Sequence, residues 1–262
     1  MSLGFAAITP HPPIIVPNLS KDNAQDVEKT VAAMKKLAEI FDESDIDTVI
    51  LISPHAEGLS NAMTIFSPKS FNGSLSAFGA SEINVRFPGQ QDLAKEIFTS
   101  TKAAGISVEI SADDFELDHG AIVPLYFLTR EVGRKINLVE IAFSELSRVD
   151  HQEFGRIISK IIDKNSERIA VVASGDLSHR IFDHEYGQDA KEFDETIVNL
   201  IKENAIADLA LLEEEVVNAA GECGYRSMLI LSGVLFERKV EPKVLSYEAP
   251  FGVGYLVANF AL

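Results

Sequence analysis

Short apolar runs alternate with segments of helical periodicity along most of this chain. The strand-like runs cover residues 3–8, 48–52, 82–87, 106–110, 136–143, 168–173, 243–247 and 253–260. Apolar residues at helical spacing fill the intervals, over residues 22–41, 90–104, 119–131, 152–163, 186–204, 208–219 and 225–236. A Ser/Gly/Asn-rich stretch, residues 57–81, interrupts the alternation and predicts a loop or a short hairpin. The pattern predicts a single α/β domain over residues 1–262, with a mainly parallel or mixed central sheet and helices on both faces.

The charge balance excludes several classes of partner. The chain has 40 acidic and 23 basic residues, a net charge of −17. Binding to nucleic acid or to an anionic membrane needs a basic face, so neither partner is expected. No Gly-x-Gly-x-x-Gly or Gly-Lys-Ser/Thr pattern is present, so nothing indicates a nucleotide-phosphate site.

The expected compartment is the cytoplasm. One cysteine rules out an internal disulfide and suits a reducing environment. No apolar stretch approaches the roughly 18 residues that span a bilayer, and the first residues lack the basic region of a signal peptide. We therefore expect a soluble cytoplasmic protein.

Four of the six histidines stand where a strand-like run breaks into a turn: His11, His55, His119 and His179. Ligands bind at the carboxyl ends of the strands in open α/β sheets. Imidazole is the commonest metal-binding and proton-transferring side chain near neutral pH. The four histidines therefore predict an active site that holds a metal.

Each of the first three histidines has a purely structural alternative. His11 stands between two prolines, which make a stiff turn suited to a metal ligand, although a capping or core histidine is also compatible. His55 follows Ser53-Pro54 and repeats the arrangement. His119 precedes a helix, where it could donate to a bound anion, or Asp118 could simply cap that helix.

His179 follows the most apolar run of the chain. Gly175 permits a sharp turn there, and Asp176 or Ser178 is expected to set the tautomer of the His179 ring, as a general base requires. His151 and His184 stand among polar and acidic neighbours, and both are predicted to lie on the surface.

Two histidines need a third protein ligand to form a catalytic metal site. Glu222 would complete a two-His, one-carboxylate set suited to Fe(II), whereas Cys223 would make a softer set that favours zinc or copper. The surrounding Gly221–Gly224 segment could also be a plain turn, with Cys223 a small buried side chain. Glu248 is a weaker third candidate.

The motifs together resemble a known family. They are His11-Pro12-Pro13, Ser53-Pro54-His55, Asp118-His119-Gly120-Ala121 with Val123-Pro124-Leu125, and Gly175-Asp176-Leu177-Ser178-His179. In this order and spacing they resemble the LigB-like superfamily of class III extradiol ring-cleavage dioxygenases, across essentially the whole chain. The tail is closer to the branch of the Memo-like proteins and protein B of the AmmeMemoRadiSam system; its motifs are Glu222-Cys223-Gly224-Tyr225 and Gly252-Val253-Gly254-Tyr255.

The resemblance implies a role for each site residue. His11 and His55 fall on metal ligands, His179 on the catalytic base, and His119 on a histidine that contacts substrate or oxygen. The dioxygenases take their third ligand from a glutamate near Glu222, whereas Memo-like proteins use a cysteine that matches Cys223. This sequence carries both residues side by side.

Two functions follow from the resemblance. The first is a non-haem Fe(II)-dependent extradiol dioxygenase that opens a catechol-type ring with O₂. The alternative is a Memo-like metal-binding or redox protein without ring cleavage, acting with a radical-SAM or AMMECR1-like partner. A zinc hydrolase in the same pocket is a third option. The resemblance also implies a homo-oligomer.

Overall fold

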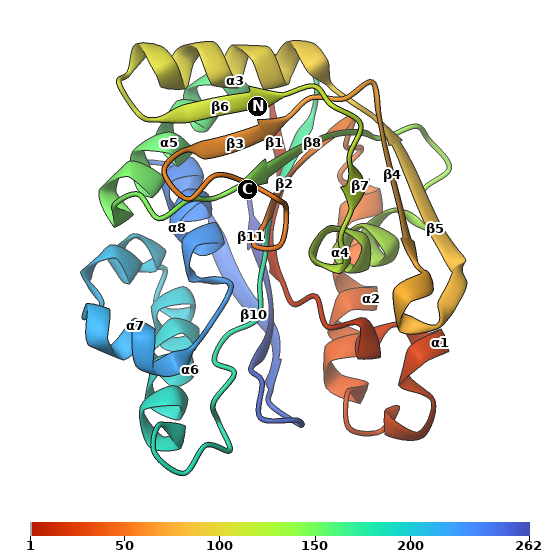
Figure 1. Ribbon diagram of the computed structural model, residues 1–262, viewed down its shortest axis with the longest axis vertical. Helices are drawn as coiled ribbons and strands as arrows, with labels where there is room; N and C mark the ends of the chain where they lie inside the picture. The colour runs from red at the N-terminus through yellow and green to blue at the C-terminus, as the bar shows by residue number, and fades with distance from the viewer. Residues whose placement is uncertain (1) are drawn as a thin grey trace.

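The computed structural model describes residues 2–262. Its main sheet has eight strands in the order β10-β11-β1-β9-β2-β8-β3-β6 (Figure 1). The four central strands run parallel: β1 (Leu3–Thr9), β9 (Ile169–Ser174), β2 (Thr48–Ser53) and β8 (Asn137–Ala142). β11 (Tyr255–Ala261) lies antiparallel to β1, and β10 (Glu241–Glu248) pairs with β11. β3 (Met63–Phe66) lies antiparallel to β8 and carries β6 (Val108–Ser111) in parallel.

The central strands are buried on both faces because helices cover both. Every residue of β2 and of β9 is buried, which explains their continuous apolar sequences. Along β2, Ile50 and Ile52 pack into one core, and Val49 and Leu51 pack into the other.

The helices divide between these two cores. One face carries α3 (Gln91–Ala103), α5 (Arg148–Ile162), α6 (Gly187–Lys202), α7 (Glu214–Ala220) and α8 (Tyr225–Leu235). The opposite face carries α2 (Glu28–Glu43) and α4 (His119–Thr129), and Figure 1 shows the two groups on either side of the sheet. The predicted α/β class, mixed sheet and two-sided helix cover are confirmed. No helix within residues 2–262 has both the length and the apolar character needed to cross a bilayer.

A small second sheet covers α4. It contains β5 (Ala80–Pro88), β4 (Ser70–Leu75) and β7 (Glu116–Leu117), and its apolar side chains join the core of α2 and α4. The prediction of a loop or hairpin over residues 57–81 was therefore wrong in part. β4 does begin a hairpin with β5, but β3 belongs to the main sheet. Four residues between Ser- and Gly-rich stretches are too few to show a strand period.

The sequence also misplaced the start of the first long helix. A helical segment was expected from residue 22, whereas a single helical turn, α1 (Pro17–Ser20), and a 3₁₀ turn precede α2, which begins at Glu28.

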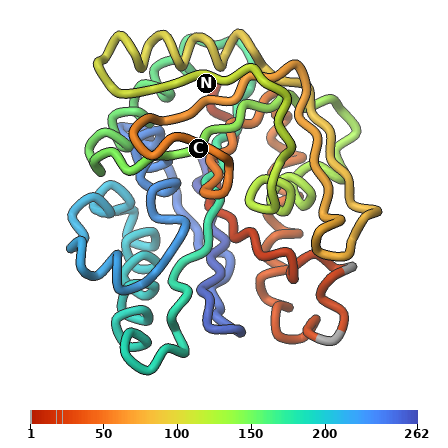
Figure 2. Tube along the Cα trace, viewed as in Figure 1, coloured from red at the N-terminus to blue at the C-terminus, as the bar shows by residue number. Residues whose placement is uncertain are grey.

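The carboxyl ends of β1, β9 and β2 lie at one edge of the sheet, because the three strands are parallel neighbours. In the trace of Figure 2, the segments that follow these strands converge near the centre of the molecule. The turn before α8 joins them through the backbone, where the N–H groups of Cys223 and Gly224 donate to the Asp176 carbonyl. Residues more than 200 positions apart thereby meet at one place.

Candidate metal centre

His11 is held in one tautomer by a hydroxyl at the end of β9. Its ring is buried, 2% exposed, and Nδ1 lies 3.0 Å from Ser174 Oγ. The Ser174 hydroxyl donates its own proton to the Gly120 carbonyl at 2.6 Å. Because a serine hydroxyl has a single proton, it must accept from the Nδ1–H of His11. The Nε2 of His11 is therefore left with a free lone pair, as a metal ligand requires.

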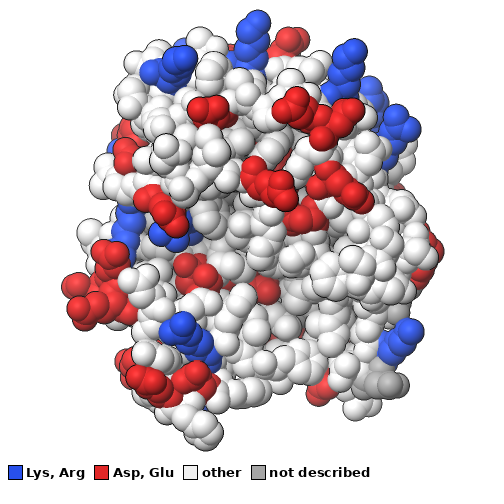
Figure 3. Space-filling model, viewed as in Figure 1, with Lys and Arg blue, Asp and Glu red and all other residues white. Residues whose placement is uncertain are grey.

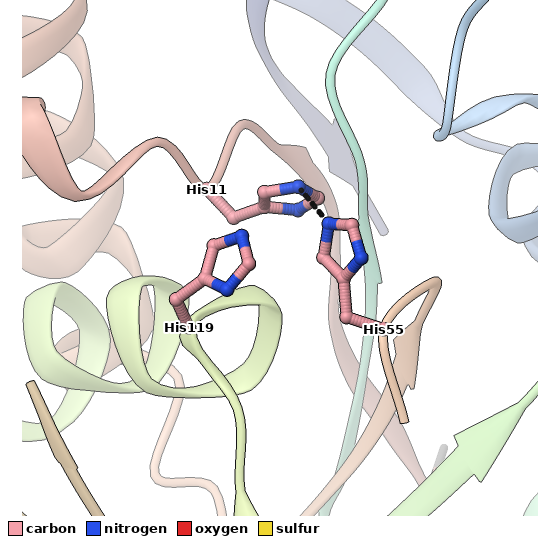
Figure 4. A group of neighbouring side chains, drawn as sticks. All are labelled: His11, His55 and His119. Atoms are coloured by element: carbon pink, nitrogen blue, oxygen red, sulfur yellow. Dashed lines mark hydrogen bonds between the residues drawn. The ribbon is translucent and has the colours of Figure 1, made fainter. Parts of the chain in front are cut away.

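His55 and His119 complete a group of three rings that point toward one another (Figure 4). Nε2 of His55 lies 3.1 Å from Nε2 of His11. The rings of His55 and His119 are stacked, with centroids 4.5 Å apart. His119 opens α4, and the Asp118 carboxylate caps that helix by accepting from the Gly120 and Ala121 N–H groups. The cap predicted for Asp118 is thus present, and it orients His119 toward the site.

The Cys223 thiol lies within contact distance of both His11 and His179. Cys223 Sγ lies 3.6 Å from His11 Nε2 and 3.7 Å from His179 Nε2. The Asp176 N–H donates to Cys223 Sγ at 3.3 Å, so the loop after β9 holds the thiol in place. A Cβ on Gly175 would lie 2.1 Å from Gly224 Cα, so this close approach of two backbones requires glycine.

Glu222 and Glu248 face other partners. The Glu222 carboxylate accepts from the Tyr225 N–H at the start of α8, and it lines a separate pocket with Arg148 and Arg226. The Glu248 carboxylate accepts from the backbone N–H and the hydroxyl of Thr30 on α2, at 2.8 and 2.6 Å. Of the three candidates for a third ligand, the fold brings Cys223 to the histidines.

Desolvation disfavours the charged form of three of the site imidazoles, those of His11, His119 and His179. It lowers the pKa of His11 well below the usual value, and the neighbouring His55, His119 and His179 lower that pKa further. Partial desolvation and the neighbouring His55 also lower the pKa values of His119 and His179. These neutral rings offer lone pairs at neutral pH, which a metal ligand or a general base needs.

Burial raises the pKa values of the acidic groups at the site, whereas it lowers those of the histidines. Burial raises the pKa of Asp176 to about 7. Burial and the charge of Asp176 raise the pKa of the Cys223 thiol. Desolvation thus disfavours negative charge at groups that have no cationic partner, and a bound cation would relieve that cost.

The donor atoms fit a divalent transition metal. Within residues 2–262, two sets of three side chains bring their donor atoms within 4.8 Å of one another: His11, His55 and His119, and His11, Asp176 and Cys223. Imidazole nitrogen, thiol sulfur and carboxylate oxygen are ligands of iron, zinc and copper. His11 belongs to both sets and is the centre of the arrangement.

Several expectations about supporting residues need correction. Asp176 or Ser178 was expected to set the tautomer of the His179 ring. Instead, the Asp176 carboxylate accepts from the backbone N–H of His11 at 3.1 Å. Ser178 donates its backbone N–H to the Asp194 carboxylate and its hydroxyl to the Ala220 carbonyl. Sequence reasoning also missed Ser174 and the exposed Phe78, whose ring centroid lies 5.3 Å from that of His119. The position of Ser174 at the end of β9, directly before Gly175, was the one available signal.

The two remaining histidines differ from each other. His184 is exposed, as predicted. His151 was predicted on the surface but is fully buried on α5, where its ring nitrogens face the carbonyls of Ser147 and Ser144. The helix begins at Arg148 rather than at residue 152, and its amphipathic face turns His151 inward despite polar sequence neighbours.

The comparison with protein families agrees with this geometry. Residues 5–258 match the family described as the catalytic LigB subunit of aromatic ring-opening dioxygenase. The chain belongs to the LigB family. At family level this supports an oxidoreductase of the dioxygenase type that depends on a metal.

This LigB-family chain is similar in sequence to three known proteins. A Clostridium acetobutylicum protein whose name states no activity is 29% identical over 97% of this chain, which spans only 57% of that protein's length. The Escherichia coli 3,4-dihydroxyphenylacetate 2,3-dioxygenase is 22% identical, over 92% of each chain. A Mycobacterium sp. (strain MCS) 2,3-dihydroxyphenylpropionate/2,3-dihydroxicinnamic acid 1,2-dioxygenase is 28% identical, over 65% of this chain and 55% of its own.

The LigB-family fold is also found in a solved structure. An uncharacterised Escherichia coli K12 protein superposes with a TM-score of 0.67, at 17% identity, over 98% of this chain and 99% of its own. At that identity the likeness concerns the fold alone.

Proposed function

We propose that this chain is a metal-dependent extradiol dioxygenase that opens a catechol-type ring with O₂. The observation that carries the proposal is the meeting of four histidines and Cys223 at the carboxyl ends of β1, β9 and β2. Family membership and the two relatives named as ring-cleaving dioxygenases support it.

In this proposal His11 and His55 hold Fe(II), and Cys223 is the third protein ligand. The Nε2 lone pair of His11 is directed by the Ser174 hydroxyl toward Nε2 of His55, so both donors face one point. The bound iron would supply Lewis acidity and an electron source for the reaction of a catechol with O₂.

His179 and His119 handle protons and charge. His179 is exposed, and its lowered pKa keeps the ring neutral near pH 7, so its ring can take a proton from a catechol hydroxyl. His119 is half-buried, and its position at the start of α4 suits it to donate to negative charge that develops on the substrate.

The test begins with protein purified without oxygen. Elemental analysis is expected to find iron at one equivalent per chain, and O₂ uptake is expected on adding members of a catechol panel. Iron-loaded protein that consumes no O₂ with any catechol would contradict ring cleavage.

A pair of variants tests the proposed base. His179→Ala is expected to lower O₂ uptake by about 10²-fold or more, the typical contribution of a general base, while metal content stays at the wild-type level. His184→Ala removes an exposed histidine outside the site and is expected to keep wild-type activity. Full turnover by His179→Ala would exclude this role.

One observation favours a second candidate, a Memo-like metal-binding or redox protein without ring cleavage. The thiol of Cys223, rather than the carboxylate of Glu222, lies beside His11. A thiolate ligand favours zinc or copper, whereas non-haem Fe(II) is usually held by two histidines and a carboxylate. This candidate predicts copper or zinc in the purified protein, no O₂ uptake with catechols, and association with a radical-SAM partner.

A further inference from the structure

A pocket of about 460 Å³ opens beside His55 and is lined almost entirely by acidic and aromatic side chains. Its acidic lining residues are Glu57, Asp113, Asp114, Glu116 and Asp118. Among residues 2–262, no lysine or arginine lines this pocket. Its volume lies in the range of small-molecule sites.

Two phenyl rings form the apolar part of the wall. Phe66, at the end of β3, and Phe115 are stacked with centroids 4.4 Å apart and planes 12° apart. Both line the pocket. Such a wall suits a flat aromatic ring or an alkyl chain, whereas the carboxylates require a positive or a hydrogen-donating group.

A buried carboxyl lies behind this wall. Glu140 on β8 is fully buried and stands directly opposite Phe66 in the β3–β8 register. Neither of its oxygens has a partner among the described residues, and Oδ2 of Asp118 is likewise buried and unpaired. Burial, together with the negative charge of Asp118, raises the pKa of Glu140 well above its usual value. Glu140 is thus held uncharged behind the wall, and the negative potential of the pocket comes from the carboxylates that line it.

The surface around the site has the same character. In Figure 3, Asp and Glu side chains gather about the centre of this face, whereas most Lys and Arg side chains stand toward its rim. A concave surface lined by one sign of charge concentrates ligands of the opposite sign.

We propose that the substrate is a catechol-type compound that carries a cationic ammonium side chain rather than a carboxylate. This inference rests on the proposed function, since it places the catechol hydroxyls at the histidines and the side chain in the acidic pocket. An ammonium group gains attraction from the five lining carboxylates, and a carboxylate is repelled by them. This preference for a cationic catechol differs from the Escherichia coli relative, whose name gives an anionic catechol, 3,4-dihydroxyphenylacetate, as its substrate.

The test is equilibrium binding of three catechols to the metal-loaded protein without oxygen, measured by calorimetry. The probes are dopamine (cationic), 4-methylcatechol (neutral) and 3,4-dihydroxyphenylacetate (anionic). Dopamine is expected to bind about 10-fold tighter than 4-methylcatechol, and the acid more weakly still, with the preference shrinking as salt screens the pocket. Binding of the acid as tightly as dopamine, or of none of the three, would overturn the proposal.

Matched variants assign the effect to the pocket. Asp113→Asn/Asp114→Asn/Glu116→Gln removes three exposed lining charges and is expected to abolish most of the preference for dopamine. The control Asp189→Asn/Glu192→Gln/Glu203→Gln removes three exposed charges from α6 and its end, and is expected to keep the preference. Equal effects of the two triple variants would mean that overall charge, not the pocket, sets selectivity, and would overturn the proposal.

The same measurements separate the two proposals. Selective dopamine binding without O₂ uptake would contradict ring cleavage and support the cationic ligand. O₂ uptake with the anionic catechol in preference to dopamine would support ring cleavage and contradict the cationic substrate.

Discussion

His11 shows how one side chain can be defined by groups from three parts of the chain. Ser174 sets the tautomer of its ring, the Asp176 carboxylate accepts from its backbone N–H, and Cys223 lies beside its ring Nε2. Only the tight Pro-His-Pro turn is local. The remaining contacts come from residues 163, 165 and 212 positions away, so the tautomer and the surroundings of His11 depend on the complete fold.

The third ligand can be tested at this scale by two neighbouring substitutions. Cys223→Ala is expected to weaken metal binding by about 10-fold or more, because it removes the thiol that lies 3.6 Å from His11 Nε2. Glu222→Gln is expected to bind metal as the wild type does, since that carboxylate accepts from the Tyr225 N–H and lines a separate pocket. A metal titration monitored by calorimetry compares the affinities of the two variants. A larger loss of affinity in Glu222→Gln than in Cys223→Ala would identify Glu222 as the ligand.

The hydroxyl of Ser174 is a positioning group. Ser174→Ala is expected to lower metal affinity by about 10-fold, because His11 then loses the partner that selects its tautomer. Ser178→Ala removes a buried hydroxyl of the same loop that bonds to Ala220 instead, and is expected to leave metal affinity unchanged. Equal losses in the two variants would point to a general loosening of the loop.

Among the elements, α5 and α8 are packed unusually close. A Cβ on Gly155 would lie 2.0 Å from the Ile230 carbonyl oxygen, and a Cβ on Gly233 would lie 2.0 Å from that of Gln152. Two helices that touch backbone to backbone cannot accept a side chain without moving apart. This contact fixes α8, and therefore the turn that presents Cys223.

Gly233→Ala is expected to destabilise the protein by about 1–3 kcal/mol, because the added methyl group overpacks this crossing. Gly133→Ala is a matched control, since nothing lies within 4 Å of its Cβ position. Chemical denaturation measures both, and a Gly233→Ala protein as stable as the control would contradict the packing argument.

For the molecule as a whole, buried titratable groups limit stability at both ends of the pH range. The native state lowers the pKa values of His11, His119, His151 and His179, so the unfolded chain binds more protons below about pH 6.5 and stability falls there. The native state raises the pKa of Glu140, so it holds more protons than the unfolded chain above about pH 4.5. The Glu140 contribution to stability is therefore lost as pH rises toward its folded pKa.

Glu140→Gln tests that second limit. A glutamine stays neutral at every pH, so the variant is expected to lose less stability between pH 6 and pH 9 than the wild type does. Melting temperatures across this range measure the difference, with the exposed Glu96→Gln as control. Parallel pH profiles for wild type and Glu140→Gln would mean that Glu140 has a partner that keeps its pKa ordinary.

The sequence predicted most of the fold because its signals are local. Alternating apolar runs and helical periods indicate an α/β sheet covered on both faces, whichever strands pair. The failures occurred where pairing or packing decided the outcome. Met63–Phe66 became a strand through its pairing with β8, and His151 was buried because its helix began four residues earlier than its pattern indicated.

By itself the sequence determined that histidines stand at the carboxyl ends of strands, since each strand and its turn are encoded within a few residues. Only the tertiary structure shows which of Glu222 and Cys223 lies beside His11. The two are adjacent, and nothing local distinguishes them as ligands. The backbone of their turn is held by the Asp176 carbonyl, which directs Cys223 toward His11 and leaves Glu222 at the start of α8. Neighbouring side chains point in different directions, and only the contact between two distant loops sets which of them faces the site.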